Sequence, residues 1–487
     1  MRLPARAHPY VAALLAYESA LADVADEWGT PLNLVFPDVL RGNIDEFRTL
    51  LARYDISYRI NFAHKVNQSA ALVLAAREHG IGIDVASAGE LRSARAAGFT
   101  GDRIEATGPK GRALLGELIA AGACVNVDNA WELTQLAAMA ASVGRRVPVL
   151  VRLCEPAAAA VGPRRLSRFG VTSSQFRLML ATLLANRESV DFAGFSFHLD
   201  TGDTGPRLRM VDECLRLTEE CWAAGLSPRI LDVGGGFRQV FTAELARFDA
   251  YSHALREGLA GRGDALTWNG TGLGYRHEAG SVRGVPVFHR FGNTVGPAES
   301  LAALLDGPLP GQGGRAVARV LRDNLLELWL EPGKGLADQA GVTIAQVEFV
   351  KEAADGSTLV NLDISRDKIA PADQEIMVDP ALIYRTARAP APGRVYFAGN
   401  LCLERDMIYQ HATYLDRLPE PGDLVVFVNT AAYQMDLSAS AALMYPSPAR
   451  LAVSGPPGAL IVRADLGAGT ALAAPGVPEL PGRAHAL

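Results

Sequence analysis

From residue 58 onward the chain alternates short apolar runs with longer segments of helical period, and this alternation constrains the fold more than any other feature. Eight apolar runs predict strands, at residues 58–65, 81–85, 103–107, 123–128, 147–153, 192–199, 229–233 and 327–331. Ala- and Leu-rich segments between them predict helices, at residues 69–79, 88–97, 111–121, 130–142, 174–187 and 207–225. Such alternation predicts a parallel sheet, and eight units favour a closed (β/α)8 TIM barrel over a doubly wound open sheet.

The segments on either side of the barrel predict a second, β-rich domain. We expect residues 1–35 to contribute an N-terminal helix and a strand to that domain, and residues 36–336 to form the barrel. Short β-like runs between Pro and Gly turns place the β-rich domain at 337–455. Residues 456–487 are expected to hold a final strand and a mobile tail rich in Ala, Gly and Pro.

The connection between the seventh and eighth predicted strands is much longer than the others and predicts an insertion at about 238–320. It contains Trp268, Tyr275, His277, His289 and Arg290. A long insertion in a compact domain is often a lid or a binding loop. An excursion without a role in the site, or a contact between subunits, explains its length equally well.

Composition and charge exclude several classes of protein. The net charge of −6 argues against a nucleic-acid surface, and we find no charge-free apolar stretch long enough to span a membrane. Five cysteines, an odd number with no CxxC pair, indicate free thiols and a cytoplasmic protein. The nine histidines show no HExxH or similar spacing, so we predict no metal site.

Chemistry in a barrel lies at the carboxyl ends of the strands. Reactive or turn-forming residues recur at these ends: Lys65, Asp84, Thr107-Gly108, Asp128-Asn129, Arg152, His198, Gly234-Gly235-Gly236 and Glu331. Lys65 is notable because the chain holds five lysines among 47 basic residues. A buried amine can lose its proton and attack a carbonyl, although a lysine reaching out from a strand end to solvent explains the position as well.

Taken in order, the motifs of residues 30–445 resemble the fold-type III pyridoxal phosphate (PLP) decarboxylases, a family that includes the diaminopimelate, ornithine and arginine decarboxylases. The resemblance rests on the motifs that begin at Ala63 (AHKVN), Gly82 (GIDVASAGE), Ser167 (SRFG), Phe195 (FSFH), Asp232 (DVGGG), Glu331 (EPGK), Gly399 (GNLC, with Asp406) and Gly422 (GD, with Ala432-Tyr433). One such motif is weak evidence, but eight in the right order are specific.

The resemblance implies a role for each matching residue. Lys65 would form a Schiff base with PLP, and His198 would stack on the pyridine ring. Glu331 would pair with the ring nitrogen and keep the ring electron-accepting. The phosphate would be held by a group of residues that follow later strands: Thr201, Gly234, Gly235, Gly236, Lys334 and Tyr433. From position alone, each could equally be an ordinary core, turn or ion-pair residue.

The resemblance further implies a homodimer with shared active sites. Cys402 is similar to the family cysteine that reaches the partner subunit's site and returns a proton there, although a buried thiol is the simpler interpretation of an isolated cysteine. Residues implied in substrate binding are Arg168, Asp363, Glu404 and Asp406.

Three departures from the family pattern bear on the substrate. Lys334 stands where the family has Arg, and Asp200 stands where it has a smaller residue. Leu403 replaces the carboxylate that usually follows the cysteine. We therefore predict PLP-dependent decarboxylation at the α-carbon of a non-standard amino acid. The alternatives are an amino-acid racemase, which would favour Arg over Glu331 at the ring nitrogen, and a non-catalytic regulator, which would be expected to lose Lys65 or Glu331.

Overall fold

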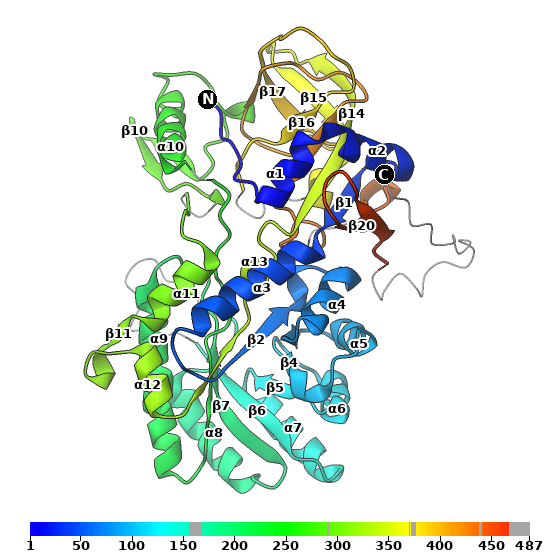
Figure 1. Cartoon of the computed structure of the whole chain (residues 1–487). Helices are drawn as coiled ribbons and strands as arrows, with labels where there is room; N and C mark the ends of the chain where they lie inside the picture. The colour runs from blue at the N-terminus through cyan, green and yellow to red at the C-terminus, as the bar shows by residue number, and fades with distance from the viewer. Residues whose placement is uncertain are drawn as a thin grey trace.

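The computed structural model shows a barrel and a separate β-rich sheet, drawn in the lower and upper halves of Figure 1. The structure describes residues 1–466 except 155–166, 243, 290–291, 370, 372–375 and 438–440. The predicted mobile tail therefore lies almost wholly outside the described residues. In the described part of the chain, no helix is both long enough and apolar enough to cross a membrane.

Eight parallel strands close into the predicted barrel, because the last strand pairs with both the first and the seventh. In spatial order they are β13 (Glu327–Leu330), β2 (Tyr58–Ala63), β3 (Gly82–Val85), β4 (Ile104–Ala106), β5 (Cys124–Val127), β6 (Val147–Leu153), β7 (Val190–Phe197) and β8 (Ile230–Asp232). All eight overlap the predicted runs. The first ends two residues earlier than predicted, so Lys65 lies in a short 3₁₀ helix, His64–Val66, instead of in the strand.

Helices surround the barrel, and side chains cap the first turns of several of them. They are α3 (Pro37–Leu51), α4 (Ala70–Glu78), α5 (Ala88–Ala96), α6 (Arg112–Ala121), α7 (Ala130–Ser142), α8 (Ser173–Ala185), α9 (Thr204–Ala223), α11 (Pro297–Leu305) and α12 (Val317–Asp323). Ser69, Ser87 and Asn129 accept hydrogen bonds from backbone N–H groups in the first turns of α4, α5 and α7. These groups have no partner inside a helix, so the caps fix where each helix starts after its strand.

The β-rich sheet has nine strands. They are β1 (Leu32–Val35), β14 (Gly341–Glu352), β15 (Thr358–Leu362), β16 (Ala381–Ile383), β17 (Gly393–Ala398), β18 (Thr413–Leu415), β19 (Leu424–Val428), β20 (Ala449–Ser454) and β21 (Ile461–Ala464). The predicted N-terminal strand joins this sheet, since β1 runs antiparallel to β14 and parallel to β20. The sequence did not predict β16, β18 or β20. The first two have three residues each, too few for a period to be visible.

Two N-terminal helices, α1 (Pro9–Ala16) and α2 (Glu18–Trp28), stand where the sequence predicts one. Tyr17 interrupts them with φ −101° and ψ 65°, outside the helical region. The short helices α13 (Gly333–Leu336) and α14 (Arg366–Ile369) follow β13 and β15.

The long connection between β8 and β13 carries structure of its own. It holds α10 (Leu245–Leu259), the hairpin of β9 (Tyr275–Glu278) and β10 (Ser281–Gly284), and the short pair β11 (Pro308–Leu309) and β12 (Arg315–Ala316). In Figure 1, α10 and β10 lie level with the β-rich sheet instead of beside the barrel strands. Trp268 donates its backbone N–H to Gln410 and packs its ring on Tyr396, so the insertion is attached to the β-rich sheet.

Candidate active site

One cavity of about 250 Å³ collects the predicted residues at the carboxyl ends of the barrel strands. Its lining includes Lys65, His198, Gly236, Glu331, Lys334 and Tyr433 from the sequence prediction. The insertion adds residues that the family resemblance does not assign: Arg238, Gln239, Phe241 and His289. Ile376 and Leu437 also line the cavity and come from the part of the chain beyond the barrel. The cavity wall is therefore shared by the barrel, the insertion and the C-terminal part of the chain.

The turn that carries Lys65 is fixed from the far end of the chain. Tyr433 donates its backbone N–H to the carbonyl of Val66 at 2.8 Å, and the Asn67 side chain donates to the carbonyl of Ala431 at 2.8 Å. Lys65 Nζ lies 3.7 Å from Oδ2 of Asp84, which is buried at the end of β3, and 36% of the lysine side chain is exposed. The amine therefore faces the cavity from a rigid base.

The charge on Lys65 differs from the sequence expectation. Burial alone lowers the pKa of an ammonium group and would favour the neutral amine. Here the negative charges of Asp84 and Glu331 outweigh burial, and the net pKa of Lys65 lies above its ordinary value. In the free chain the lysine is therefore an ammonium ion, because its partners are carboxylates that the strand pattern alone did not place beside it.

The glycine turn after β8 lies against His198 and Glu331. Gly234 and Gly236 have φ of 67° and 77°, which side chains rarely adopt, and Gly235 donates its backbone N–H to Nδ1 of His198 at 3.2 Å. A Cβ atom on Gly235 would overlap the Glu331 carbonyl. Burial and the nearby Lys65 charge lower the pKa of His198 well below its usual range, so this imidazole is neutral.

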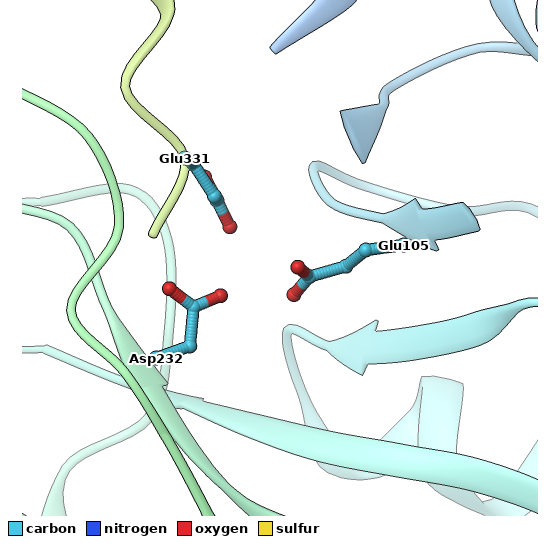
Figure 2. A group of neighbouring side chains, drawn as sticks. All are labelled: Glu105, Asp232 and Glu331. Atoms are coloured by element: carbon cyan, nitrogen blue, oxygen red, sulfur yellow. The ribbon is translucent and has the colours of Figure 1, made fainter. Parts of the chain in front are cut away.

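Three buried carboxyl groups meet inside the barrel below the cavity. Figure 2 shows Glu105 of β4, Asp232 of β8 and Glu331 after β13 pointing toward one another. Carboxyl oxygens of the three lie within 4.8 Å of one another, and each residue is at most 4% exposed. Neutral donors surround Glu105: the side-chain amides of Asn61 and Asn126 donate to it at 2.8 and 3.2 Å.

The carboxyl groups of this cluster bind protons more tightly than free carboxyl groups do. Burial raises the pKa of Glu331, Asp232 and Glu105 well above their ordinary values, and the mutual repulsion of the three groups adds to the shift. Hydrogen bonds join Asp232 to both Glu105 and Glu331, and such a bond between two carboxyl groups requires a proton on one of them. The three groups therefore titrate as one coupled unit.

Two departures from the family pattern are partners of each other. Lys334 Nζ lies 2.9 Å from Oδ2 of Asp200, and both line the cavity. Behind the glycine turn, the buried Arg207 donates to the carbonyls of Leu199 and Gly235. Arg238 approaches the same region from the other side, since a Cβ on Gly202 would lie 2.5 Å from its guanidinium. Two guanidinium groups, of Arg207 and Arg238, therefore lie near the glycine turn.

Several predicted residues do not line the cavity of the described chain. Asp406 is buried and accepts backbone N–H groups of Leu401 and Arg366 at 2.7 and 2.8 Å, so it holds the loop that carries Cys402. Asp363 accepts the backbone N–H of Gln346 at 2.8 Å, at the junction of β14 and β15.

The other predicted residues outside the cavity are closer to solvent. Glu404 and Cys402 are exposed on the same loop. The exposed Arg168 stacks its guanidinium on Phe169, and the half-buried Thr201 accepts the backbone N–H of Asp203 at 3.1 Å.

The sequence holds a signal for Glu105 and its amide neighbours. Asn61, Glu105 and Asn126 are polar residues inside otherwise apolar strands. Such residues point into a barrel or out of it according to register, and register is not visible in one strand. The structure resolves this by placing all three in one buried network with Ser196, which donates to Asn126 at 2.7 Å.

Comparison with known proteins identifies the family. Residues 40–266 match the family described as "Pyridoxal-dependent decarboxylase, pyridoxal binding domain". An uncharacterized protein of Sinorhizobium fredii, y4yA, is 33% identical over 449 residues, which cover 90% of this chain and 91% of that protein. The chain belongs to the fold-type III pyridoxal-dependent decarboxylase family.

More distant relatives agree with this assignment. The diaminopimelate decarboxylase of Vibrio cholerae is 24% identical over 88% of each chain. Among solved structures, diaminopimelate decarboxylase of Helicobacter pylori in complex with L-lysine has a TM-score of 0.66 at 17% identity and covers 91% of this chain and 95% of its own. Lysine/ornithine decarboxylase of Vibrio vulnificus with putrescine has a TM-score of 0.64 at 19% identity and covers 89% and 97%. These structures share the barrel and β-domain fold.

The cofactor of this family is PLP, and the cavity fits it. A lysine faces the cavity at one wall, a buried carboxyl group stands at another, and the glycine turn is packed so closely that a side chain would not fit. Basic residues near the turn provide positive charge for a phosphate. Family and fold together support a PLP-dependent amino-acid decarboxylase in general.

Proposed function

We propose that this protein removes the α-carboxylate of an amino acid as CO2, using PLP held in the barrel cavity. The observation that carries the proposal is the pair formed by Lys65 and Glu331, an amine and a buried carboxyl group that line one cavity of the size of a small ligand site. A racemase of similar fold would be expected to carry Arg at the Glu331 position, so the carboxyl group favours decarboxylation.

Different residues around the cavity would bind the ring of the cofactor and its phosphate. Lys65 would hold PLP through its aldehyde, the neutral imidazole of His198 would cover one ring face, and Glu331 would bind the ring nitrogen. The glycine turn, Arg238 and Lys334 would hold the phosphate, with Tyr433 beside them. When bound, PLP supplies an electron-accepting ring that stabilises the electron pair left behind on loss of CO2.

The protein's own groups would control the protons. The carboxyl cluster supplies Glu331 with a buried environment in which a proton can be shared, and a cationic ring would draw Glu331 to its ionised form. Lys65 Nζ, whose charge Asp84 stabilises, is one group able to return a proton to the α-carbon. Cys402 Sγ is the other candidate. It is exposed on a β-domain loop, so we propose that it serves the site of the partner subunit in a homodimer.

The cavity favours a substrate other than a simple diamino acid. Among the described residues, the carboxyl groups that line it are Asp200 and Glu331. Asp200 is paired with Lys334, and Glu331 belongs to the carboxyl cluster. Within one chain, neither is left to neutralise a distal ammonium group, which agrees with the loss of the family carboxylate at Leu403. We therefore propose a specialised amino acid as substrate.

The proposal is tested by loading the purified protein with PLP and incubating it with a panel of L- and D-amino acids. Release of CO2 with formation of the matching amine is expected for at least one member, together with unchanged chirality of the recovered substrate. Lys65→Ala should abolish the reaction, whereas Lys351→Ala, at an exposed lysine of β14, should preserve it. Inversion of the α-carbon without CO2 would instead support a racemase.

A further inference from the structure

The buried histidine of the insertion, His289, faces the cavity without a hydrogen-bond partner. It is 4% exposed, and neither Nδ1 nor Nε2 contacts a donor or acceptor in the described part of the chain. Its ring packs against Phe248 with 4.6 Å between centroids, and against Phe241 and Phe288 at 6.4 Å. These aromatic contacts fix the imidazole among three rings while it lines the same cavity as Lys65.

Both ring nitrogens of His289 lack a hydrogen-bond partner among the described residues. Burial, together with the charge of the neighbouring His411, lowers the pKa of His289 to about 4, so the ring is neutral at physiological pH. A neutral imidazole has one N–H donor and one acceptor nitrogen, and buried groups of this kind are almost always hydrogen-bonded. A ligand that both donates and accepts would satisfy it.

The rings packed on His289 are those of phenylalanines, and the titratable neighbour that acts on it is His411, which lies 3.6 Å from Asp379. The lining has apolar side chains at Ala63, Phe241, Ile376 and Leu437, and Gln239 already donates its side-chain amide to Asn429 at 2.7 Å. A distal ammonium group brought here would lose its water shell, and no described carboxylate of the lining is left to pair with it. An uncharged polar group loses much less on burial.

We propose that His289 is a specificity-determining residue that hydrogen-bonds an uncharged donor–acceptor group, such as an amide or ureido group, at the far end of the substrate side chain. This inference rests on the proposed function, because it takes the cavity to be the substrate site. It gives the insertion a role that the family resemblance does not assign. The insertion places a neutral imidazole in the cavity, where it can recognise the substrate side chain.

The inference is tested by binding, separately from catalysis. The PLP-loaded protein is titrated with uncharged polar (L-glutamine, L-citrulline), apolar (L-norvaline, L-norleucine) and cationic (L-ornithine, L-lysine) amino acids. The concentration that gives half of the change in visible absorbance reports the affinity. Variants are His289→Phe, His289→Gln and the control His253→Phe, at an exposed histidine of the same insertion.

The wild-type protein is expected to bind an uncharged polar member at least about tenfold more tightly than its apolar and cationic counterparts. His289→Phe should remove this preference, His289→Gln should keep part of it, and His253→Phe should leave it unchanged. The inference is overturned if ornithine or lysine binds tightest, if no uncharged polar member binds, or if His289→Phe preserves the ranking. Binding with the expected ranking but without CO2 release from any amino acid would refute the decarboxylation and leave the role of His289 intact.

Discussion

Glu105 changes the chemistry of the site at the scale of single residues. It adds a third carboxyl group to Asp232 and Glu331. Beyond the effect of burial, its charge and its hydrogen bond raise the pKa of Asp232, and the repulsion between Glu105 and Glu331 raises the pKa of Glu105. Glu331 must be ionised to stabilise a cationic ring nitrogen, so Glu105 makes that ionisation harder at low pH. Asn61 and Asn126 hold Glu105 in place, which indicates a fixed position in the barrel interior.

Replacing Glu105 by Gln should move the acidic limb of the pH–rate profile to lower pH. The neutral amide keeps the size of the side chain and can still accept from Asn61, but it removes one ionisable group and its repulsion of Glu331 from the coupled cluster, so the cluster ionises at lower pH. The measurement is kcat/KM against pH for both proteins, with Glu348→Gln, at an exposed site on β14, as control. An acidic limb that does not move would show that Glu105 does not influence the ionisation of Glu331.

The sequence was a good guide to single residues at strand ends and a poor one to residues that act in pairs. Lys65, His198 and Glu331 could be placed at one rim, because the carboxyl ends of parallel strands meet there. The pairing of Lys334 with Asp200 could not be predicted, since 134 residues separate them and their contact depends on the turn between β7 and α9. The direction of the Lys65 pKa shift could not be predicted for the same reason, since Asp84 and Glu331, which raise this pKa, come from other parts of the chain.

At the scale of elements, a buried polar junction joins the insertion, the segment that follows α13 and the β-rich sheet. Asn429, which ends β19, donates its side-chain amide to Asp338 at 2.8 Å. Its oxygen accepts from the Gln239 side chain and from the backbone of Gln339, each at 2.7 Å. One amide therefore connects three segments that are far apart in the sequence, beside the cavity wall.

Asn429→Ala should destabilise the protein by roughly 2–4 kcal/mol. It leaves buried donors and a buried carboxyl group without partners, and it places a residue other than Asn or Gly at a φ of 58°. Urea denaturation measures the change in the free energy of unfolding. The control Asn324→Ala removes a side-chain amide that caps the end of α12 near solvent and should cost less than about 1 kcal/mol. Equal losses of stability in Asn429→Ala and Asn324→Ala would show that the junction does not stabilise the protein.

The junction should also make stability depend on pH through Asp338. Burial raises the pKa of Asp338 from 3.8 to about 6, and hydrogen bonds from Asn429 oppose this only in part. Between these values the folded state binds the proton more tightly than the unfolded state, so the stability contributed by this group is present below 3.8 and is lost as pH rises through about 6. Asp338→Asn should remove about 2–3 kcal/mol from the change in the free energy of unfolding across this pH window. Urea denaturation at several pH values measures this free energy. A slope equal to that of the wild type would contradict the assignment.

The elements themselves followed closely from hydrophobic period. Every barrel strand overlapped its predicted run, because buried parallel strands are mostly apolar and glycine or polar residues follow their ends. The β-rich sheet was predicted less completely. Its strands β16 and β18 are three residues long and are stabilised by pairing with β19 and β17, which local sequence does not report.

At the scale of the whole molecule, the site of one chain is incomplete by the proposed mechanism. Cys402 is exposed on a loop that Asp406 holds rigid, and it does not line the cavity of its own chain in the described residues. A homodimer that places this loop over the partner's cavity would complete two equivalent sites.

Mixing two inactive variants tests this arrangement. Lys65→Ala and Cys402→Ala should each be nearly inactive as homodimers, and a dimer of one copy of each should contain one site with both residues intact. Native subunits exchange at low protein concentration, so about half of the dimers in an equal mixture should be mixed. Each mixed dimer has one intact site of two, so about a quarter of the wild-type activity should return. No restoration, in a mixture shown to exchange subunits, would place Cys402 outside the partner's site.

The central claim is that Lys65 holds PLP in the barrel cavity, and the visible absorbance of the purified protein with added PLP tests it most directly. Lys65→Ala, after gel filtration, should lose the yellow absorbance and at least about a thousandfold of the CO2 release, while Lys351→Ala keeps both. If Lys65→Ala remained as yellow and as active as the wild type, the account would be wrong.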